Sequence, residues 1–379
     1  HAVLRLNHVG DWGTQFGMLL AYLEEQKDQE SGEQLNRELG DLENFYRAAK
    51  QRFDESPEFA DRARALVVKL QSGDDYCLSL WREFNQVSLS HCDAVYRRLG
   101  VTLGPDDVRG ESAYNDDLAR VIADLDKAGL LTEDQGAQCV FLDEFKNKDG
   151  DPLPVIVRKA DGGYLYATTD LATLWFRSEE WAAEQVVYVT DGRQRDHFEQ
   201  LFLTAGKWFA AEDKTLPELS HVWFGTILGE DNKAIKTRDG QPVKLADLLA
   251  EAVRRALVMV EEKNPGLEPA EAQRRARIIG IGAVKYADLS QDRTLDYVFS
   301  WDKLLAMQGN TAPYLQYAVA RISSIFRKLE GDPSSIMEQA RPPETEHERS
   351  LARKLVFLPL AIEQTLRELR GRGLEDEEI

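Results

Sequence analysis

The chain has 379 residues, of which 43% are hydrophobic and 30% charged, a composition typical of a soluble globular protein with two or three domains. Its net charge of −19 argues against nonspecific nucleic-acid binding, and no apolar run reaches the ~20 residues of a membrane helix. Three cysteines without a CxxC pair exclude a zinc ribbon or a disulfide framework and favour a reducing cytoplasm. We expect all three to be small buried side chains, namely Cys77, Cys92 and Cys139.

Helical patterns dominate the chain as far as Gly129, after an opening strand at about residues 2–7. Residues 41–100 predict helix throughout, with Ser56-Pro57 as a cap and first turn and Gly100 as a stop. The helix before Gly129 has apolar side chains at helical spacing on one face, namely Leu118, Val121, Ile122 and Leu125.

Short strands appear from residue 139 onward and then alternate with helices. The segments CVFLDEF, LPVIVRK and GYLYATT predict three strands separated by turns. A helix from about Asp170, the strand QVVYVT, a helix from about Gln194 and the strand HVWFGTIL follow. This alternation predicts part of a parallel, doubly wound sheet, in which ligands bind at the carboxyl ends of the strands.

The sequence predicts only helices from residue 243 onward. An amphipathic helix is expected at about 311–329 and a last helix at about 344–370, with a proline-containing loop between them.

Two segments near the expected strand ends hold side chains suited to binding charged groups. A glycine-bounded loop contains Lys233, Lys236 and Arg238, whose cations suit a pyrophosphate leaving group, although such a loop is more often simply solvated. Tyr166 and Asp170 could hold a planar cation, because a carboxylate accepts two hydrogen bonds from a guanidinium. On its own, Asp170 is more often the cap of the next helix.

Other polar residues at turns carry weaker signals. Gln194 and His197 follow a predicted strand, but a lone histidine there is more often a structural hydrogen bonder than a ligand. The same caution applies to His8 and Asp11 in the opening turn, and Trp12 is more typical of a core residue than of a stacking platform.

Five sequence blocks, in this order, resemble the arginyl-tRNA synthetases, which are class I enzymes. The blocks are LRLNHVGDWGTQFGML, DGGYLYATTDLA, KAIKTRDGQPVKLADLL, GAVKYADLS and GNTAPYLQYAVAR. The resemblance implies an α/β fold, with a Rossmann-type parallel sheet, a helical insertion at about 28–135 and an all-α anticodon-binding domain. It places the catalytic domain at 1–305, beginning just after the HIGH motif and so expected to be incomplete there. The helical domain at 306–379 is expected to be incomplete as well.

The resemblance also implies a role for each candidate residue. The five positions of the KMSKS motif are occupied by KAIKT, which makes Lys236 and Lys233 the expected catalytic residues. Tyr166 and Asp170 match the pair that recognises the guanidinium of arginine, and Gln194 matches a residue near its α-amino group. The ATP site is assigned to four residues, Phe224, Gly225, Lys236 and His197. The binding of tRNA is assigned to two residues, Tyr314 and Arg321.

The implied reaction is ATP-dependent activation of arginine to arginyl-adenylate, followed by transfer to tRNA(Arg). ATP and Mg²⁺ are the expected cofactors, and no side chain is assigned to a metal ion. We expect a cytoplasmic monomer that binds no membrane. Two alternatives stay open: an inert module that binds arginine or tRNA, and another class I synthetase such as the cysteinyl type. Asp170 and the lack of a thiolate–imidazole cluster argue against the latter.

Overall fold

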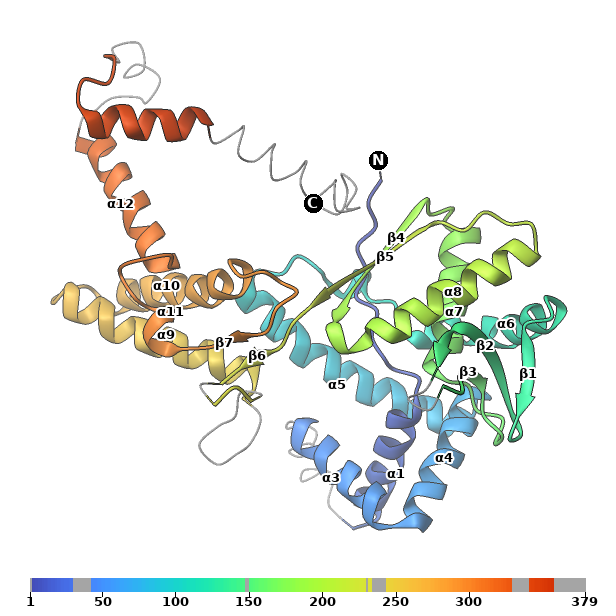
Figure 1. Cartoon of the computed structure of the whole chain (residues 1–379). Coiled ribbons are helices and arrows are strands. Elements are labelled where there is room, and N and C mark those ends of the chain that lie inside the picture. Colours follow the sequence, from blue (N-terminus) through green and yellow to red (C-terminus); the bar gives the residue numbers. More distant parts are fainter. Residues whose placement is uncertain are drawn as a thin grey trace. The chain divides into compact units, whose positions relative to one another are not determined.

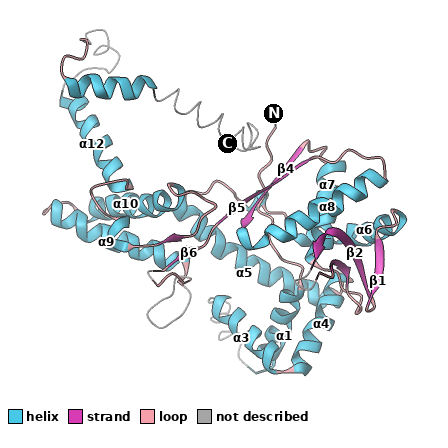
Figure 2. Cartoon of the chain, viewed as in Figure 1, coloured by secondary structure: helices cyan, strands magenta, loops and turns pink. Residues whose placement is uncertain are grey.

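The computed structural model contains helices, short strands and two compact units (Figure 1; Figure 2). The first unit comprises His1–Glu251 and Gln291–Phe299, and the second comprises Ala252–Ser290 and Ser300–Ile379. None of the helices in the described part of the chain is long and apolar enough to cross a membrane. The residues that the structure describes are 2–29, 42–146, 150–229, 231–233, 243–328 and 341–357.

Among the described residues, the amino-terminal part of the first unit contains the helices α1 (Thr14–Gln29), α3 (Leu42–Glu55), α4 (Pro57–Gln71) and α5 (Asp75–Leu99). The predicted helix signals are confirmed, since the Ser56 hydroxyl accepts the N–H of Phe59 at 3.2 Å and Gly100 ends α5 with a φ of 69°. The expected opening strand is wrong, because residues 2–7 contribute only a bridge between Asn7 and Val108. A strand pattern becomes a strand only where a neighbouring strand satisfies its backbone.

Gly17 allows α1 and α4 to approach closely. A methyl group at Gly17 would lie 2.2 Å from the Ala63 carbonyl oxygen and 2.3 Å from the Val67 side chain. Gly206 is a helical glycine as well, in α8 (Arg195–Ala211), but a methyl group there would meet nothing within 4 Å. The two glycines therefore form a matched pair for a stability experiment.

We expect Gly17→Ala to lower the free energy of unfolding by about 1–3 kcal/mol, because the added carbon overpacks the helix interface. Gly206→Ala should raise it by up to about 1 kcal/mol through helix propensity alone. Urea denaturation of the two variants and the wild-type protein measures both changes. Equal effects of the two substitutions would contradict the close packing of α1 on α4.

The next helix and a three-stranded antiparallel meander follow α5. The helix is α6 (Asn115–Lys127), and the positive φ of 68° at Gly129 confirms the predicted stop. The meander is formed by β1 (Leu131–Asp134), β2 (Ala137–Lys146) and β3 (Pro152–Arg158). The strand expected over GYLYATT is wrong, because only Tyr164 makes a bridge, to Arg158, before a helix begins.

That helix, α7 (Tyr166–Glu179), leads to a parallel strand pair. The strands are β4 (Gln185–Asp191) and β5 (Glu218–Phe224), connected through α8 and aligned from Gln185 opposite Glu218 to Asp191 opposite Phe224. The buried face of α8 consists of Phe198, Leu201, Thr204, Ala205, Trp208 and Phe209. The carboxyl ends of β4 and β5 therefore lie side by side (Figure 2).

A second parallel pair is made by segments far apart in the sequence, β6 (Ile227–Leu228) and β7 (Tyr297–Val298). The strand β7 contradicts the expectation of helices only after residue 243. The described helices there include α9 (Leu245–Lys263), α10 (Pro269–Leu289), α11 (Trp301–Leu304) and α12 (Ala312–Lys328).

The predicted amphipathic helix at about 311–329 is confirmed by α12. Of the last predicted helix, residues 346–357 are helical, and the remainder lies outside the described residues. Cys77 and Cys139 are buried as expected, whereas Cys92 is exposed on α5, contrary to prediction, since it lies on the solvent side of that helix. The chain is thus mixed α/β and mostly helical, with small parallel sheets.

Candidate active site

The first turns of α7 carry two of the predicted site residues. The helix begins at Tyr166 with Leu165 as its N-cap residue, and the Thr168 hydroxyl donates to the carbonyl of Val157 in β3. Asp170 lies in the second turn, so the interpretation of this residue as a helix cap is wrong. Because Tyr166 and Asp170 are four residues apart on one helix, their side chains share a face.

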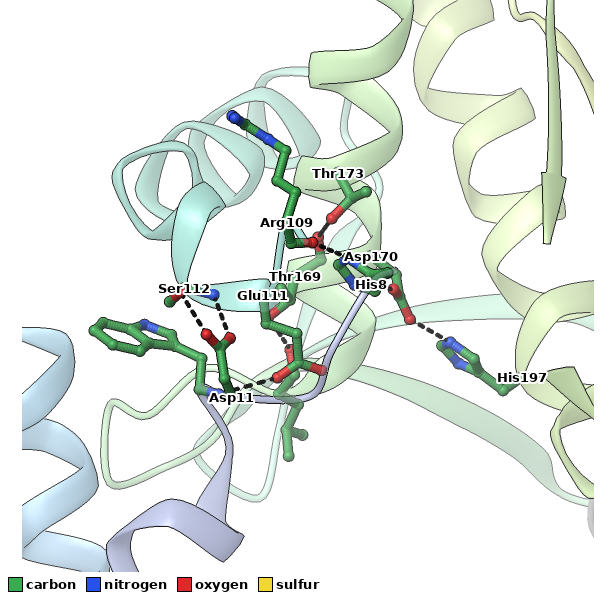
Figure 3. A network of polar contacts seen from close by, with 11 residues as sticks. His8, Asp11, Arg109, Glu111, Ser112, Thr169, Asp170, Thr173 and His197 are labelled. Carbon is green, nitrogen blue, oxygen red and sulfur yellow. Dashed lines mark hydrogen bonds and ion pairs between the residues drawn. The ribbon is translucent and has the colours of Figure 1, made fainter. Parts of the chain in front are cut away.

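The carboxylate of Asp170 lies between two histidines (Figure 3). Its Oδ2 is 2.6 Å from Nε2 of His197, and its Oδ1 is 3.9 Å from Nε2 of His8. The side chains of Asp170 and His197 are 15% and 14% exposed, so both are mostly buried but can still be reached by solvent. Tyr166 is 59% exposed as a residue, and its ring meets the His197 ring edge-on at 4.7 Å between centroids.

The backbone partner of His8 fixes its tautomer. Its Nδ1 is 3.0 Å from the carbonyl oxygen of Arg109, so Nδ1 carries the proton. Burial lowers the pKa of His8, an effect that the nearby Asp170 charge opposes and that of Arg177 reinforces. In the neutral ring, Nε2 is therefore unprotonated, and it lies 3.9 Å from Oδ1 of Asp170.

Glu111 is a member of this cluster that the sequence did not reveal. It is the first residue of η2 (Glu111–Tyr114), and its Oε2 accepts the backbone N–H of Trp12 at 3.4 Å. Burial first, and then the negative charge of Asp170, raise the pKa of Glu111 to about 7. We call His8, Glu111, Tyr166, Asp170 and His197 the Asp170 cluster.

Asp11 fixes the turn that carries this cluster. Its carboxylate is 5% exposed and accepts hydrogen bonds from the Ser112 N–H at 2.9 Å, the Ser112 hydroxyl at 2.7 Å and Asn85 at 3.2 Å. A methyl group at Gly110 would lie 2.6 Å from this carboxylate, so Asp11 can approach only a glycine. Trp12 is 5% exposed and donates its indole N–H to Asn115 at 2.7 Å, which confirms the prediction of a core residue.

The raised pKa of Glu111 predicts a pH-dependent stability. The unfolded chain releases this proton near its ordinary pKa of 4.5 and the folded chain near 7, so folding is favoured by the bound proton at low pH. We expect this contribution, at most about 3 kcal/mol before solvent screening, to be fully present below pH 4.5 and lost as pH rises through 7.

The measurement is urea denaturation of wild-type protein and Glu111→Gln at several pH values between 4 and 8. Relative to wild type, the variant should become steadily more stable as pH rises. The lowered pKa of His8 acts in the opposite direction, reducing stability below its ordinary pKa of 6.5, but it is common to both proteins. A difference that is constant with pH would contradict the burial of Glu111 beside Asp170.

The predicted adenine site lies at the carboxyl end of β5. The Phe224 side chain is 44% exposed, and the N–H of Gly225 donates to the carbonyl of Arg293 at 2.7 Å. A methyl group at Gly225 would lie 2.4 Å from the carbonyl oxygen of Leu295, so the backbone segments meet at a distance that only glycine permits.

Of the remaining predicted residues, Gln194 and Lys233 belong to the first unit, and Tyr314 and Arg321 belong to the second. Gln194 is exposed at the end of η3 (Gly192–Gln194), and Lys233 is exposed in a turn where its N–H donates to Asp231 at 3.2 Å. Lys236 lies outside the described residues. In the second unit, Tyr314 is 45% exposed on α12, and the guanidinium of Arg321 is 5.7 Å from the ring centroid of Tyr317.

Comparison with known proteins identifies the family. The family model "tRNA synthetases class I (R), catalytic domain" matches residues 1–301, and the DALR anticodon binding domain matches residues 315–374. An arginine–tRNA ligase of Alcanivorax borkumensis is 64% identical over 89% of this chain and 57% of its own length. One from Pseudomonas fluorescens is 58% identical over 93% of this chain and 60% of its own length.

A solved structure agrees with these matches. The crystal structure of arginyl-tRNA synthetase from Plasmodium falciparum is 30% identical with a TM-score of 0.74, over 96% of this chain and 59% of that chain. The architecture is thus that of a class I synthetase catalytic domain with a DALR helical anticodon-binding domain. The chain belongs to the arginyl-tRNA synthetase family and spans less than two thirds of the length of these relatives.

Proposed function

We propose that the whole protein is an arginine–tRNA ligase, which activates arginine with ATP and transfers it to tRNA(Arg). The proposal rests above all on the Asp170 cluster, in which burial and the charge of Asp170 raise the pKa of Glu111, and His197 contacts both Asp170 and the ring of Tyr166. A planar cation satisfies both carboxyl groups and can stack on an aromatic ring. Membership of the family supports the same substrate.

The contacts of Asp170 indicate how it would receive a guanidinium. Its Oδ2 is engaged by His197, whereas Oδ1 faces the unprotonated Nε2 of His8 at 3.9 Å. Oδ1 is therefore the acceptor for one N–H of the substrate. A guanidinium close to Glu111 would lower the pKa of that group from about 7, so that Glu111 releases its proton and becomes a second anionic partner. Gln194 is proposed to bind the α-amino group.

ATP is proposed to bind where β4 and β5 end, with its adenine against Phe224 and Gly225. These strands and the connecting α8 are consistent with part of a Rossmann-type sheet. The arginine carboxylate attacks the α-phosphate directly, while Lys236 and Lys233 stabilise the charge that grows on the pyrophosphate.

Mg²⁺ is proposed to accompany ATP as a counterion of its phosphates. Across the described ranges, no group of three or more His, Cys, Asp or Glu side chains converges as metal ligands would. Mg²⁺ commonly relies on substrate phosphates and keeps several waters. We therefore assign the ion to the phosphates and to no side chain.

The proposed function is tested by tRNA(Arg)-dependent exchange between ATP and pyrophosphate in the whole protein. Exchange should require arginine, and citrulline, which has the same shape without the charge, should support little or none because both carboxyl groups would stay unpaired. Exchange with another amino acid, or equal exchange with citrulline, would contradict the proposal. Binding of arginine or tRNA without exchange would instead identify a binding module.

A further inference from the structure

His197 contacts both residues that are proposed to recognise the guanidinium. Its Nε2 is 2.6 Å from Oδ2 of Asp170, and its ring meets that of Tyr166 edge-on at 4.7 Å. The His197 ring also contacts the ring of Phe198, at 5.1 Å between centroids. His197 and Phe198 are adjacent on α8, and Phe198 is buried. The imidazole therefore belongs to a helix that packs against the core.

We propose that His197 is a positioning residue of the arginine site, which fixes Asp170 and Tyr166 in the geometry that receives the guanidinium. The inference rests on the proposed arginine site. It moves His197 from the ATP site, where the sequence resemblance placed it, to the recognition of the amino acid.

The two contacts restrict side-chain rotations of Asp170 and Tyr166 that would otherwise weaken substrate binding. The carboxylate of Asp170 can turn about its last bond, and the hydrogen bond from His197 engages one oxygen so that the other stays directed away from it. Tyr166 is 59% exposed, and its contact with the imidazole ring of His197 restricts the positions that its side chain can take. A site whose groups are already oriented loses less conformational entropy when the substrate binds.

The surroundings of His197 favour this role over contact with a nucleotide. Its Nε2 is already used by a carboxylate, and its ring is flanked by Tyr166 and Phe198. Across the cluster, Nε2 of His8 is 3.9 Å from Asp170 Oδ1, beyond hydrogen-bonding distance, so the described side-chain hydrogen bond that orients this carboxylate comes from His197.

The experiment compares two substitutions at this position in the whole protein. In His197→Gln the amide nitrogen can still donate to Asp170, whereas His197→Leu keeps comparable volume without a donor. We expect His197→Leu to raise the KM for arginine ~10-fold, the scale of one lost hydrogen bond to a charged group. The KM for ATP and the kcat at saturating arginine should change by less than ~3-fold, and His197→Gln should recover most of the loss.

A double-mutant cycle shows whether His197 acts through Asp170. In an Asp170→Asn background, His197→Leu should add less than it does in the wild-type protein, because the carboxylate that it orients is already gone and only its contact with Tyr166 is left to lose. Near-UV circular dichroism checks that each variant is folded. A rise in the KM for ATP instead of arginine, additive effects in the cycle, or failure of glutamine to recover binding would each overturn the inference.

Direct titration of wild-type protein with arginine separates this inference from the function on which it rests. If the wild-type protein binds arginine and His197→Leu binds it equally well, only the positioning role is overturned. If wild-type protein does not bind arginine at all, the proposed function is overturned, and the role of His197 with it.

Discussion

Asp170→Asn is expected to raise the KM for arginine by about 10²–10³-fold, with the KM for ATP nearly unchanged. The substitution keeps the size and a hydrogen-bonding oxygen but removes the charge that the guanidinium would pair with. Breaking a shielded charge pair by removing one partner costs about 3–5 kcal/mol, and the lower part of this range corresponds to the expected change in affinity. Because Asp170 is only 15% exposed, water cannot replace the lost partner freely.

A matched control is available on α4. Asp61 forms an exposed ion pair with Arg64 at 2.6 Å on that helix, so Asp61→Asn removes a carboxylate from outside the Asp170 cluster. It should leave the KM for arginine within ~3-fold of wild type, the scale of a surface ion pair. Initial rates of ATP–pyrophosphate exchange at varied arginine, and then at varied citrulline, measure both effects. An unchanged KM in Asp170→Asn would mean that Asp170 serves only as a partner for the histidines.

Lys236→Ala should lower kcat by about 10²–10³-fold with little change in the KM for arginine. A lysine that stabilises the leaving pyrophosphate interacts more strongly with the transition state than with bound substrate, and removal of one such donor has this effect. The expectation comes from the sequence position, because Lys236 lies outside the described residues. Lys233→Ala is the matched control and should lower kcat less, since Lys233 lies nearer the entrance of the loop. Wild-type kcat in Lys236→Ala would contradict the assignment.

Helix ends were predictable from the sequence because the signals that set them are local. Ser56 and Gly100 act through backbone groups within a few residues, and both features are present in the structure. Strands were predicted less well because each one needs a partner from elsewhere in the chain. The pair formed by β6 and β7 joins Ile227 with Tyr297, and no local sequence pattern around Tyr297 predicts a partner so distant in sequence.

The beginning of α7 shows a tertiary contact overriding a local preference. The threonines in YATTD favour strands because their branched side chains crowd a helix. In the structure, the Thr168 hydroxyl donates to a carbonyl of β3 and the Thr173 hydroxyl donates to the Thr169 carbonyl. Both hydroxyls therefore have hydrogen-bond partners although their residues lie in a helix. The predicted helix start at Asp170 was late for this reason, and the correct start changes Asp170 from a cap into a side chain that meets His197.

The candidate site was predictable only in part. Tyr166 and Asp170 share a helix and a recognisable block, so they were proposed together. Glu111 belongs to a segment without a chemical motif, and its raised pKa arises from burial and from Asp170, which only the fold brings near. The contact between His197 and Asp170 likewise depends on how α8 packs beside α7, which no local pattern encodes.

The return of Gln291–Phe299 to the first unit governs where the protein can be divided. A truncation after Glu251 would remove β7, so that β6 loses its parallel partner and the Gly225 N–H loses the Arg293 carbonyl. A truncation after Phe299 keeps both, but it also retains α9 and α10. A single proteolytic cut in the exposed turn between those two helices leaves β6 and β7 on different fragments that still share a sheet. The two fragments should therefore stay associated until the first unit unfolds.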